Sequence, residues 1–164
     1  MKRILSLLAL AALSACGLHP VYSGGGHGPV AQKLGKVEIA PIEGKAGWLV
    51  RNALNDRLSA MNGSGSAYRL VVKLDDQISG FGLRSDAAVT RERRTLRARY
   101  QLFDAATGAQ VIDDTAGSDA GIDVTSSEYA TIAAEDTALE RLSQTIADEI
   151  VARLALFAAR SDRP

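Results

Sequence analysis

Residues 89–103 read VTRERRTLRARYQLF, and their side chains alternate between two kinds along the stretch. Successive side chains of a strand point to opposite faces of its sheet, so this period of two predicts one long strand. One face is expected to lie in the core, with Leu96, Ala98, Tyr100 and Leu102. The other is expected to be polar and mostly basic, with Arg91, Arg93, Thr95, Arg97, Arg99 and Gln101.

Turn and strand signals on either side of this stretch extend the sheet. Residues 104–108 begin with Asp104 and end with Gly108, which favours a hairpin, and a fourth strand is expected from residue 110 to just before residue 121. Upstream, alternating residues predict a strand over residues 68–78 that Gly80-Phe81-Gly82 interrupts. A shorter alternation over residues 36–42 predicts a first strand near a sheet edge, because it ends at Pro41.

Two other stretches have the period of a helix, residues 46–61 and a longer one that begins at an N-cap, Thr125 or Ser126, and reaches residue 159. The resulting order is strand, helix, three strands, helix. It predicts an α+β fold, a two-layer sandwich with two helices packed on one face of a four-stranded mixed sheet. The apolar faces are expected at Val50, Leu54, Leu58 and Met61, and at Ile132, Leu139, Leu142, Ile146, Ile150, Leu154 and Phe157.

The start of the chain has the pattern of an export signal that ends at a lipidation site. Lys2 and Arg3 precede an apolar run, and Leu13-Ser14-Ala15-Cys16 places small residues before the single cysteine. A buried helix or a membrane span would be the alternative, but a span needs about 20 apolar residues. We therefore expect residues 1–15 to be a signal peptide and Cys16 to carry an S-diacylglycerol and an N-acyl chain such as palmitate. More than one chain is what stable anchoring requires.

The segment after the cysteine is expected to be a tether. Residues 16–36 are rich in glycine and proline, and no Gly-Lys-Ser/Thr follows the glycine run to suggest a phosphate-binding loop. Residues 37–160 form a single predicted domain, and residues 161–164 are expected to fray.

Composition argues against several classes of function. Without the signal peptide, 17 basic residues stand against 19 acidic ones, a net charge of −2, so no global field favours nucleic acid. The acylated Cys16 provides no thiol, and His19 and His27 lie in the tether, so no enzyme and no cofactor are expected. The aspartates at 113, 114, 119 and 123 do not match a calcium-loop spacing, and no metal site is expected.

The arginine row is the one feature that suggests a ligand. Arg91, Arg93, Arg97 and Arg99 would present several fork-shaped donors on one sheet face, joined by Arg94 and by Lys73 and Arg84. Guanidinium groups are suited to bidentate contact with phosphate or carboxylate. The alternative is that these arginines pair with aspartates of the fourth strand, since opposite charges commonly pair across strands. Both interpretations remain open from the sequence.

The lipobox and the residues after it, Leu13-Ser14-Ala15-Cys16-Gly17-Leu18-His19-Pro20-Val21-Tyr22, resemble the lipopolysaccharide-assembly lipoprotein family LptE. The order of predicted elements after residue 37 is similar too. The resemblance implies a non-enzymatic outer-membrane lipoprotein on the periplasmic side that plugs the LptD β-barrel, assists its assembly and binds lipopolysaccharide. Lipopolysaccharide carries phosphates and acidic sugars, so the arginine row is the expected place of contact with it. The alternative is an auxiliary periplasmic lipoprotein of a lipid-trafficking transporter.

Overall fold

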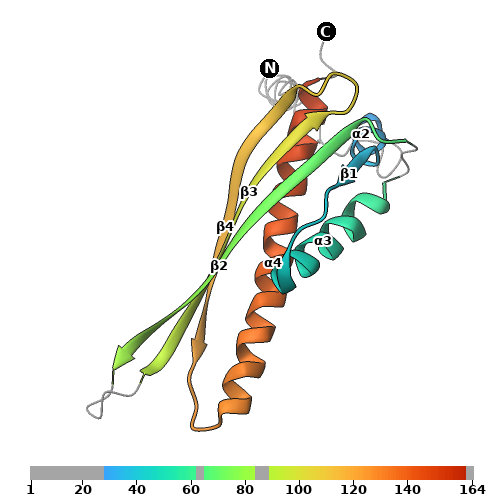
Figure 1. The fold of residues 1–164 in the computed structure, drawn as a ribbon. Helices are drawn as coiled ribbons and strands as arrows, with labels where there is room; N and C mark the ends of the chain where they lie inside the picture. Colours follow the sequence, from blue (N-terminus) through green and yellow to red (C-terminus); the bar gives the residue numbers. More distant parts are fainter. Residues whose placement is uncertain (1–27, 62–64, 84–88, 162–164) are drawn as a thin grey trace, which may run out of the picture.

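A computed structural model describes residues 28–61, 65–83 and 89–161 of the protein. In chain order its elements are α2 (Pro29–Leu34), β1 (Val37–Ile39), α3 (Gly44–Ser59), β2 (Tyr68–Leu83), β3 (Val89–Asp104), β4 (Gln110–Asp123) and α4 (Glu128–Arg160) (Figure 1). The predicted α+β class with a four-stranded mixed sheet is confirmed. The described residues contain one more helix than predicted, the short α2.

The sheet has the order β1-β2-β3-β4. β1 and β2 are parallel, and α3 makes the crossover between them, whereas β2–β3 and β3–β4 are antiparallel neighbours. The register pairs Leu70 with Leu102 on one side of β3 and Leu96 with Ser118 on the other, with one irregularity between Leu102 and Phe103. Side chains with even numbers in β2, β3 and β4 therefore share one face, which we call the inner face, and those with odd numbers share the outer face.

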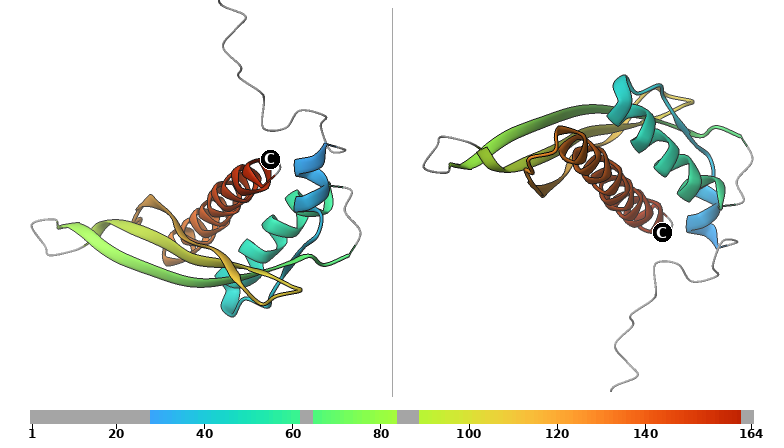
Figure 2. Two further views of the ribbon diagram at one scale, coloured as in Figure 1. Left: turned by 90° about the horizontal axis from the view of Figure 1, so that it is seen from above. Right: turned by 90° about the horizontal axis from the view of Figure 1, so that it is seen from below.

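The core lies between the inner face and the helices, and Figure 2 shows α3 and α4 on the same side of the sheet. The predicted apolar side of β3 is confirmed, because Leu96, Ala98, Tyr100 and Leu102 are all buried. One predicted core residue of α4 is wrong, since Ile132 is 50% exposed. At this end of the helix Thr131 is buried instead, and its Oγ1 accepts a hydrogen bond from the Thr125 amide at 3.3 Å.

The prediction of a flexible tether through residue 36 is wrong for its last part, where α2 forms. Pro29 occupies the first turn of α2, where its missing N–H is not needed. Val30, Ala31 and Leu34 are buried, and Leu34 faces a cavity of about 10 Å³ that Leu154 and Phe157 of α4 also line. Burial of these side chains overrides the weak helical signal of a single turn. The signal peptide and residues 16–27 lie outside the described residues.

β2 is longer than predicted, because Gly80-Phe81-Gly82 does not end it. Gly80 pairs with Glu92 and Phe81 with Arg91, so β3 supplies hydrogen-bond partners through the glycines. Gly82 takes a positive φ of 77°, a conformation that glycine adopts without strain. The other bounds agree within a few residues. The predicted N-cap of α4, Thr125 or Ser126, is wrong, because Ser127 caps the helix and its side chain accepts a hydrogen bond from the Ala130 amide.

Candidate functional site

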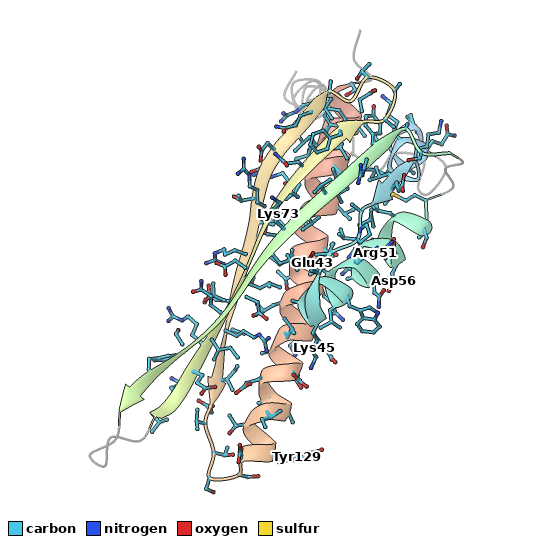
Figure 3. The ribbon with its side chains drawn as sticks, in the orientation of Figure 1. Glu43, Lys45, Arg51, Asp56, Lys73 and Tyr129 are labelled. Atoms are coloured by element: carbon cyan, nitrogen blue, oxygen red, sulfur yellow. The ribbon has the colours of Figure 1, made fainter. Side chains whose placement is uncertain are left out.

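The outer face of the sheet is the side that the helices leave open, and it carries the outer arginine row, Arg91, Arg93, Arg97 and Arg99. All four side chains are exposed. Strand periodicity brings them together on one face as predicted, while Lys73 of β2 lies directly opposite Arg99 (Figure 3).

Two arginines of the row are paired with aspartates of β4. Arg91 Nε donates to Asp123 Oδ1 at 2.9 Å, directly across the strand pair. Arg99 makes two bonds to the diagonal Asp113, from Nε to Oδ1 at 3.0 Å and from Nη2 to Oδ2 at 2.8 Å. The cross-strand pairing that the sequence left open is therefore present for these two residues.

The Arg99–Asp113 pair is the better supported of the two. The guanidinium of Arg99 and the amide of Gln101 hold the pKa of Asp113 down at about 2. Because the folded pKa is depressed, the stability that this carboxylate contributes is present above its ordinary pKa and is lost only as the pH falls towards 2. The Arg99 side chain is 64% exposed and that of Asp113 is 29% exposed, so water screens the pair and its contribution to stability is small.

Arg93 and Arg97 have no carboxylate partner among the described residues. The Arg93 guanidinium carbon lies 5.3 Å from the centroid of the Phe81 ring, a cation–π contact. The Arg97 side chain lies over Gly117, so close that a Cβ added to Gly117 would be 2.6 Å from Arg97 Cδ. Arg97 Nη1 also donates a long hydrogen bond of 3.3 Å to the Ser118 carbonyl. These two guanidinium groups retain most of their donors for a ligand.

The prediction that Arg94 joins the row is wrong. Arg94 belongs to the inner face, where its Nε and Nη2 bind both carboxylate oxygens of Asp76 at 2.8 and 2.6 Å. Its Nη1 donates to the Glu135 carbonyl of α4 at 2.9 Å, and its side chain is 11% exposed. The even residue number places it with Leu96 and not with Arg93. Arg84 lies outside the described residues.

Sequence reasoning missed the charged cluster on the inner face around Arg94. Glu92 Oε2 is buried without a hydrogen-bond partner, and it faces Glu135 of α4. Burial, followed by the neighbouring charge of Glu92, raises the pKa of Glu135. The even numbers of Glu92 and Arg94 were the available signal, but residues this polar are expected in water and not under a helix.

Tyr100 is a second polar group of the inner face. Its side chain is fully buried and its hydroxyl has no hydrogen-bond partner in the described residues. Burial and then the carboxylate of Asp114, opposite it in β4, raise the pKa of Tyr100 to about 12.

Tyr100→Phe is expected to leave the free energy of unfolding at pH 7 unchanged or to raise it by about 1 kcal/mol, because the lost hydroxyl is desolvated and unpaired. Unfolded tyrosine ionises near pH 10. The raised folded pKa therefore gives stability that is present below pH 10 and lost as the pH rises towards 12. Urea unfolding of both proteins between pH 7 and pH 11.5 should show a steeper alkaline loss for the wild type. Parallel pH profiles would contradict this assignment.

Two further aspartates of the sheet and its hairpin, Asp104 and Asp114, have structural partners. Asp104 Oδ1 accepts hydrogen bonds from the Thr107 amide, the Thr107 hydroxyl and the Ala106 amide in the predicted hairpin, and these bonds hold the pKa of Asp104 below its ordinary value. Asp114 Oδ2 lies 3.7 Å from Arg153 Nε of α4. Within the described residues, His, Cys, Asp and Glu form no group of three that could hold a metal ion. Cys16, His19 and His27 lie outside those residues.

None of the described helices is both long and apolar enough to cross a membrane.

Comparisons with known proteins agree with this architecture. Among solved structures, a protein described as a lipoprotein from Caulobacter crescentus CB15 is 30% identical, with a TM-score of 0.66 over 79% of this chain and 96% of that one. Rare lipoprotein B from Shewanella oneidensis is 12% identical, with a TM-score of 0.60 over 77% of this chain and 98% of that one. Lipoprotein B from Nitrosomonas europaea is 14% identical, with a TM-score of 0.53 over 74% and 84%. The last two show a shared fold.

None of the curated proteins compared with the chain matches it. The model of the family LptE, described as lipopolysaccharide-assembly, matches residues 34–154, from the end of α2 to the last turns of α4. This match covers the whole sheet, all of α3 and α4 as far as Leu154. The chain therefore belongs to the LptE lipopolysaccharide-assembly family.

Proposed function

We propose that this protein is anchored through acylated Cys16 to the periplasmic side of the outer membrane, plugs an LptD-like β-barrel and assists its assembly. In the same proposal the outer arginine row binds lipopolysaccharide during delivery to the outer leaflet. The family membership and the lipidation signal support the location and the partner. The proposed role is binding and assembly, with no catalytic step.

The observation that carries the ligand assignment is the open sheet face with Arg93 and Arg97 free of carboxylates in the described residues. Phosphates of lipopolysaccharide are matched by guanidinium forks, which bind them bidentately. Arg91 and Arg99 hold Asp123 and Asp113 and so form the two ends of the row. A phosphate that reaches them competes with those aspartates, so we assign the larger share of binding to Arg93 and Arg97.

The double variant Arg93→Glu/Arg97→Glu is expected to weaken lipopolysaccharide binding at least tenfold. Each charged hydrogen bond contributes about 1.5–3 kcal/mol, and 1.4 kcal/mol is a factor of ten. The matched control is Arg51→Glu/Arg141→Glu, which changes the net charge equally on exposed helix positions without ion pairs in the described residues. Binding to immobilised lipopolysaccharide at 50 and 150 mM salt measures both. Equal losses in the two variants would show that only net charge matters and would remove the arginine row from the site.

Association with a barrel is tested by extracting the tagged, acylated protein from outer membranes in mild detergent. A large β-barrel recovered in equal amount supports the plug. Recovery of inner-membrane transporter subunits instead would favour the auxiliary lipoprotein and overturn the proposal. A Cys16→Ser variant, which cannot be acylated, is the control for the anchor and should be lost from the membrane fraction.

A further inference from the structure

The two edges of β2 differ sharply in how they are covered. On one side β3 pairs with β2 along its length, from Tyr68–Asp104 to Leu83–Val89. On the other side β1 pairs only with Tyr68, Arg69 and Leu70, near the top of the strand in Figure 1. Beyond Leu70, most of β2 has no neighbouring strand on that side within the described residues.

One hydrogen bond shows which backbone groups of β2 face this uncovered side. The Leu70 carbonyl accepts from the Ala40 amide at 2.9 Å, so Leu70 faces the β1 side. Both backbone groups of a strand residue point to the same edge, and residues alternate between edges. The N–H and C=O groups of Val72, Leu74, Asp76, Ile78 and Gly80 therefore face the same way as those of Leu70. No other described residue donates to or accepts from them on this side.

The covering chain leaves β2 at Pro41, which has no N–H to continue the pairing. Between the departing residues 41–43 and residues 71–74 of β2 lies a groove of about 430 Å³. Glu43 and Lys73 flank this groove and are labelled in Figure 3. The lining of the groove ends at Leu74, where the free edge of β2 continues, so an extended segment placed alongside Val72 has further unpaired backbone groups ahead of it.

The opposite edge of the sheet, along β4, is in contact with a helix side chain. On β4 the amide of Gly117 donates to Glu149 Oε2 of α4 at 3.3 Å, so a helix side chain reaches the backbone there. An uncovered edge is a template for another strand, and proteins usually block it with proline, lysine or a covering element. Residues 72–80 of β2 contain no proline, and their one lysine, Lys73, lies beside the groove at the start of the free edge.

The side chains along the free edge define which kind of strand would fit beside β2. Ile78 on the inner face is 43% exposed, although it is apolar, and Asp76 beside it is neutralised by Arg94. On the outer face, Asp75 accepts hydrogen bonds from the Gln77 amide and forms no ion pair within the described residues, although Arg97 is its direct neighbour across β3. A fitting strand has apolar side chains over Ile78 and a basic side chain near Asp75 on the other face.

A second copy of this chain fits poorly. Full antiparallel pairing of residues 72–80 with the same residues of another copy is centred on Asp76 and sets the two Asp76 side chains opposite each other. Each Asp75 then stands opposite Gln77 of the other copy, which brings no cation to it. Although Arg94 neutralises each Asp76, this self-pairing leaves the charge of Asp75 unmatched across the new strand pair, whereas a foreign strand that carries a base matches it.

We propose that the free edge of β2, residues 72–80, is a strand-addition site for an extended segment of the barrel partner. The inference rests on the proposed function, which supplies that partner. The wall of a closed barrel has no free edge. The added strand therefore comes from a loop or a terminal segment outside the wall, and it adds backbone hydrogen bonds to whatever side-chain contacts hold the plug.

Residue-resolved amide exchange tests the site in the protein alone and in the complex extracted with its barrel. In the protein alone, the amides of residues 72, 74, 76, 78 and 80 should exchange fast, while residues 73, 75, 77 and 79, bonded to β3, should exchange slowly and act as internal controls. In the complex the even-numbered amides should slow at least tenfold. Unchanged exchange in a complex that does form would overturn the inference and leave the proposed function intact.

Absence of any barrel in the extract would overturn both proposals. Slow even-numbered amides in the protein alone that speed up on dilution would identify a second copy as the occupant and would also overturn the inference.

Ile78→Pro gives an independent test, because it removes an edge-facing N–H without a bond to β3. It should lower recovery of the barrel severalfold, whereas the matched variant Ile78→Val keeps the N–H and should not. Equal recovery with a folded Ile78→Pro protein would count against the site. If that variant does not fold, the exchange experiment on the wild type decides.

Discussion

Arg94→Ala is expected to lower the free energy of unfolding by about 3 kcal/mol, near the lower end for removing one partner of a buried ion pair. Arg94 makes two bonds to Asp76 and one to the Glu135 carbonyl, and the Asp76 side chain is only 23% exposed. Its loss leaves Asp76 without its ion-pair partner and removes the positive charge that stabilises the Glu135 carboxylate. Urea unfolding at pH 7 measures the change.

The matched control lies on the same strand but on the opposite face. Arg91 pairs with Asp123 with both side chains more than half exposed, so Arg91→Ala should change stability by less than about 1 kcal/mol. Similar losses in the two variants would contradict the difference in burial on which this expectation rests.

The pH dependence of Arg94→Ala provides a second check. Even beside Arg94, the folded pKa of Glu135 is raised, so its contribution is present below its ordinary pKa and lost as the pH rises through the folded value. Without the cation the pKa of Glu135 should rise further, since Arg94 no longer stabilises its charged form. The deficit of the variant should therefore shrink as the pH falls from 7 towards 4. A deficit that grows in acid would show that the carboxyl groups are not its cause.

Periodicity was sufficient for the long elements of the fold. Along β3 the alternation of Leu96, Ala98, Tyr100 and Leu102 is strict, and burial follows it residue by residue. The short α2 escaped prediction because one turn of helix has almost no periodicity, and its stability comes from contacts with α4 that the local sequence does not contain. Gly80 and Gly82 suggested an end to β2 because glycine is a poor strand former, yet pairing with β3 outweighed that preference.

The site was only partly predictable for a related reason. Because side chains alternate between the two faces of a strand, Arg91, Arg93, Arg97 and Arg99 lie on one face. The choice of their ion-pair partners, however, depends on the register with β4. The Arg99–Asp113 pair is diagonal, and no local pattern fixes which diagonal is used. The distinction between paired and unpaired arginines, on which the proposed ligand contact depends, therefore required the structure.

Ile150→Ala is expected to lower the free energy of unfolding by about 2–5 kcal/mol, the range for an isoleucine truncated in a packed core. Ile150 is fully buried on the side of α4 that packs into the core between the sheet and α3. The lost methyl and methylene groups leave a cavity that the long helix cannot close, because neighbours such as Ile146 and Leu154 are fixed in the same packed layer. Ile150→Val, which removes one carbon, should lose about 0.5–1.5 kcal/mol.

The matched control is Leu156→Ala, on the same helix but 38% exposed. It should lose less than half as much as Ile150→Ala, because much of its surface stays in water in the folded protein. Thermal and urea unfolding of the three variants with unchanged m-values would place the loss in the native core. Alanine is the best helix former, so helix propensity cannot cause a loss at Leu156. Since α4 forms one wall of that core over its length, an equal loss at Leu156 would mean that the deeper burial of Ile150 does not set the size of the effect.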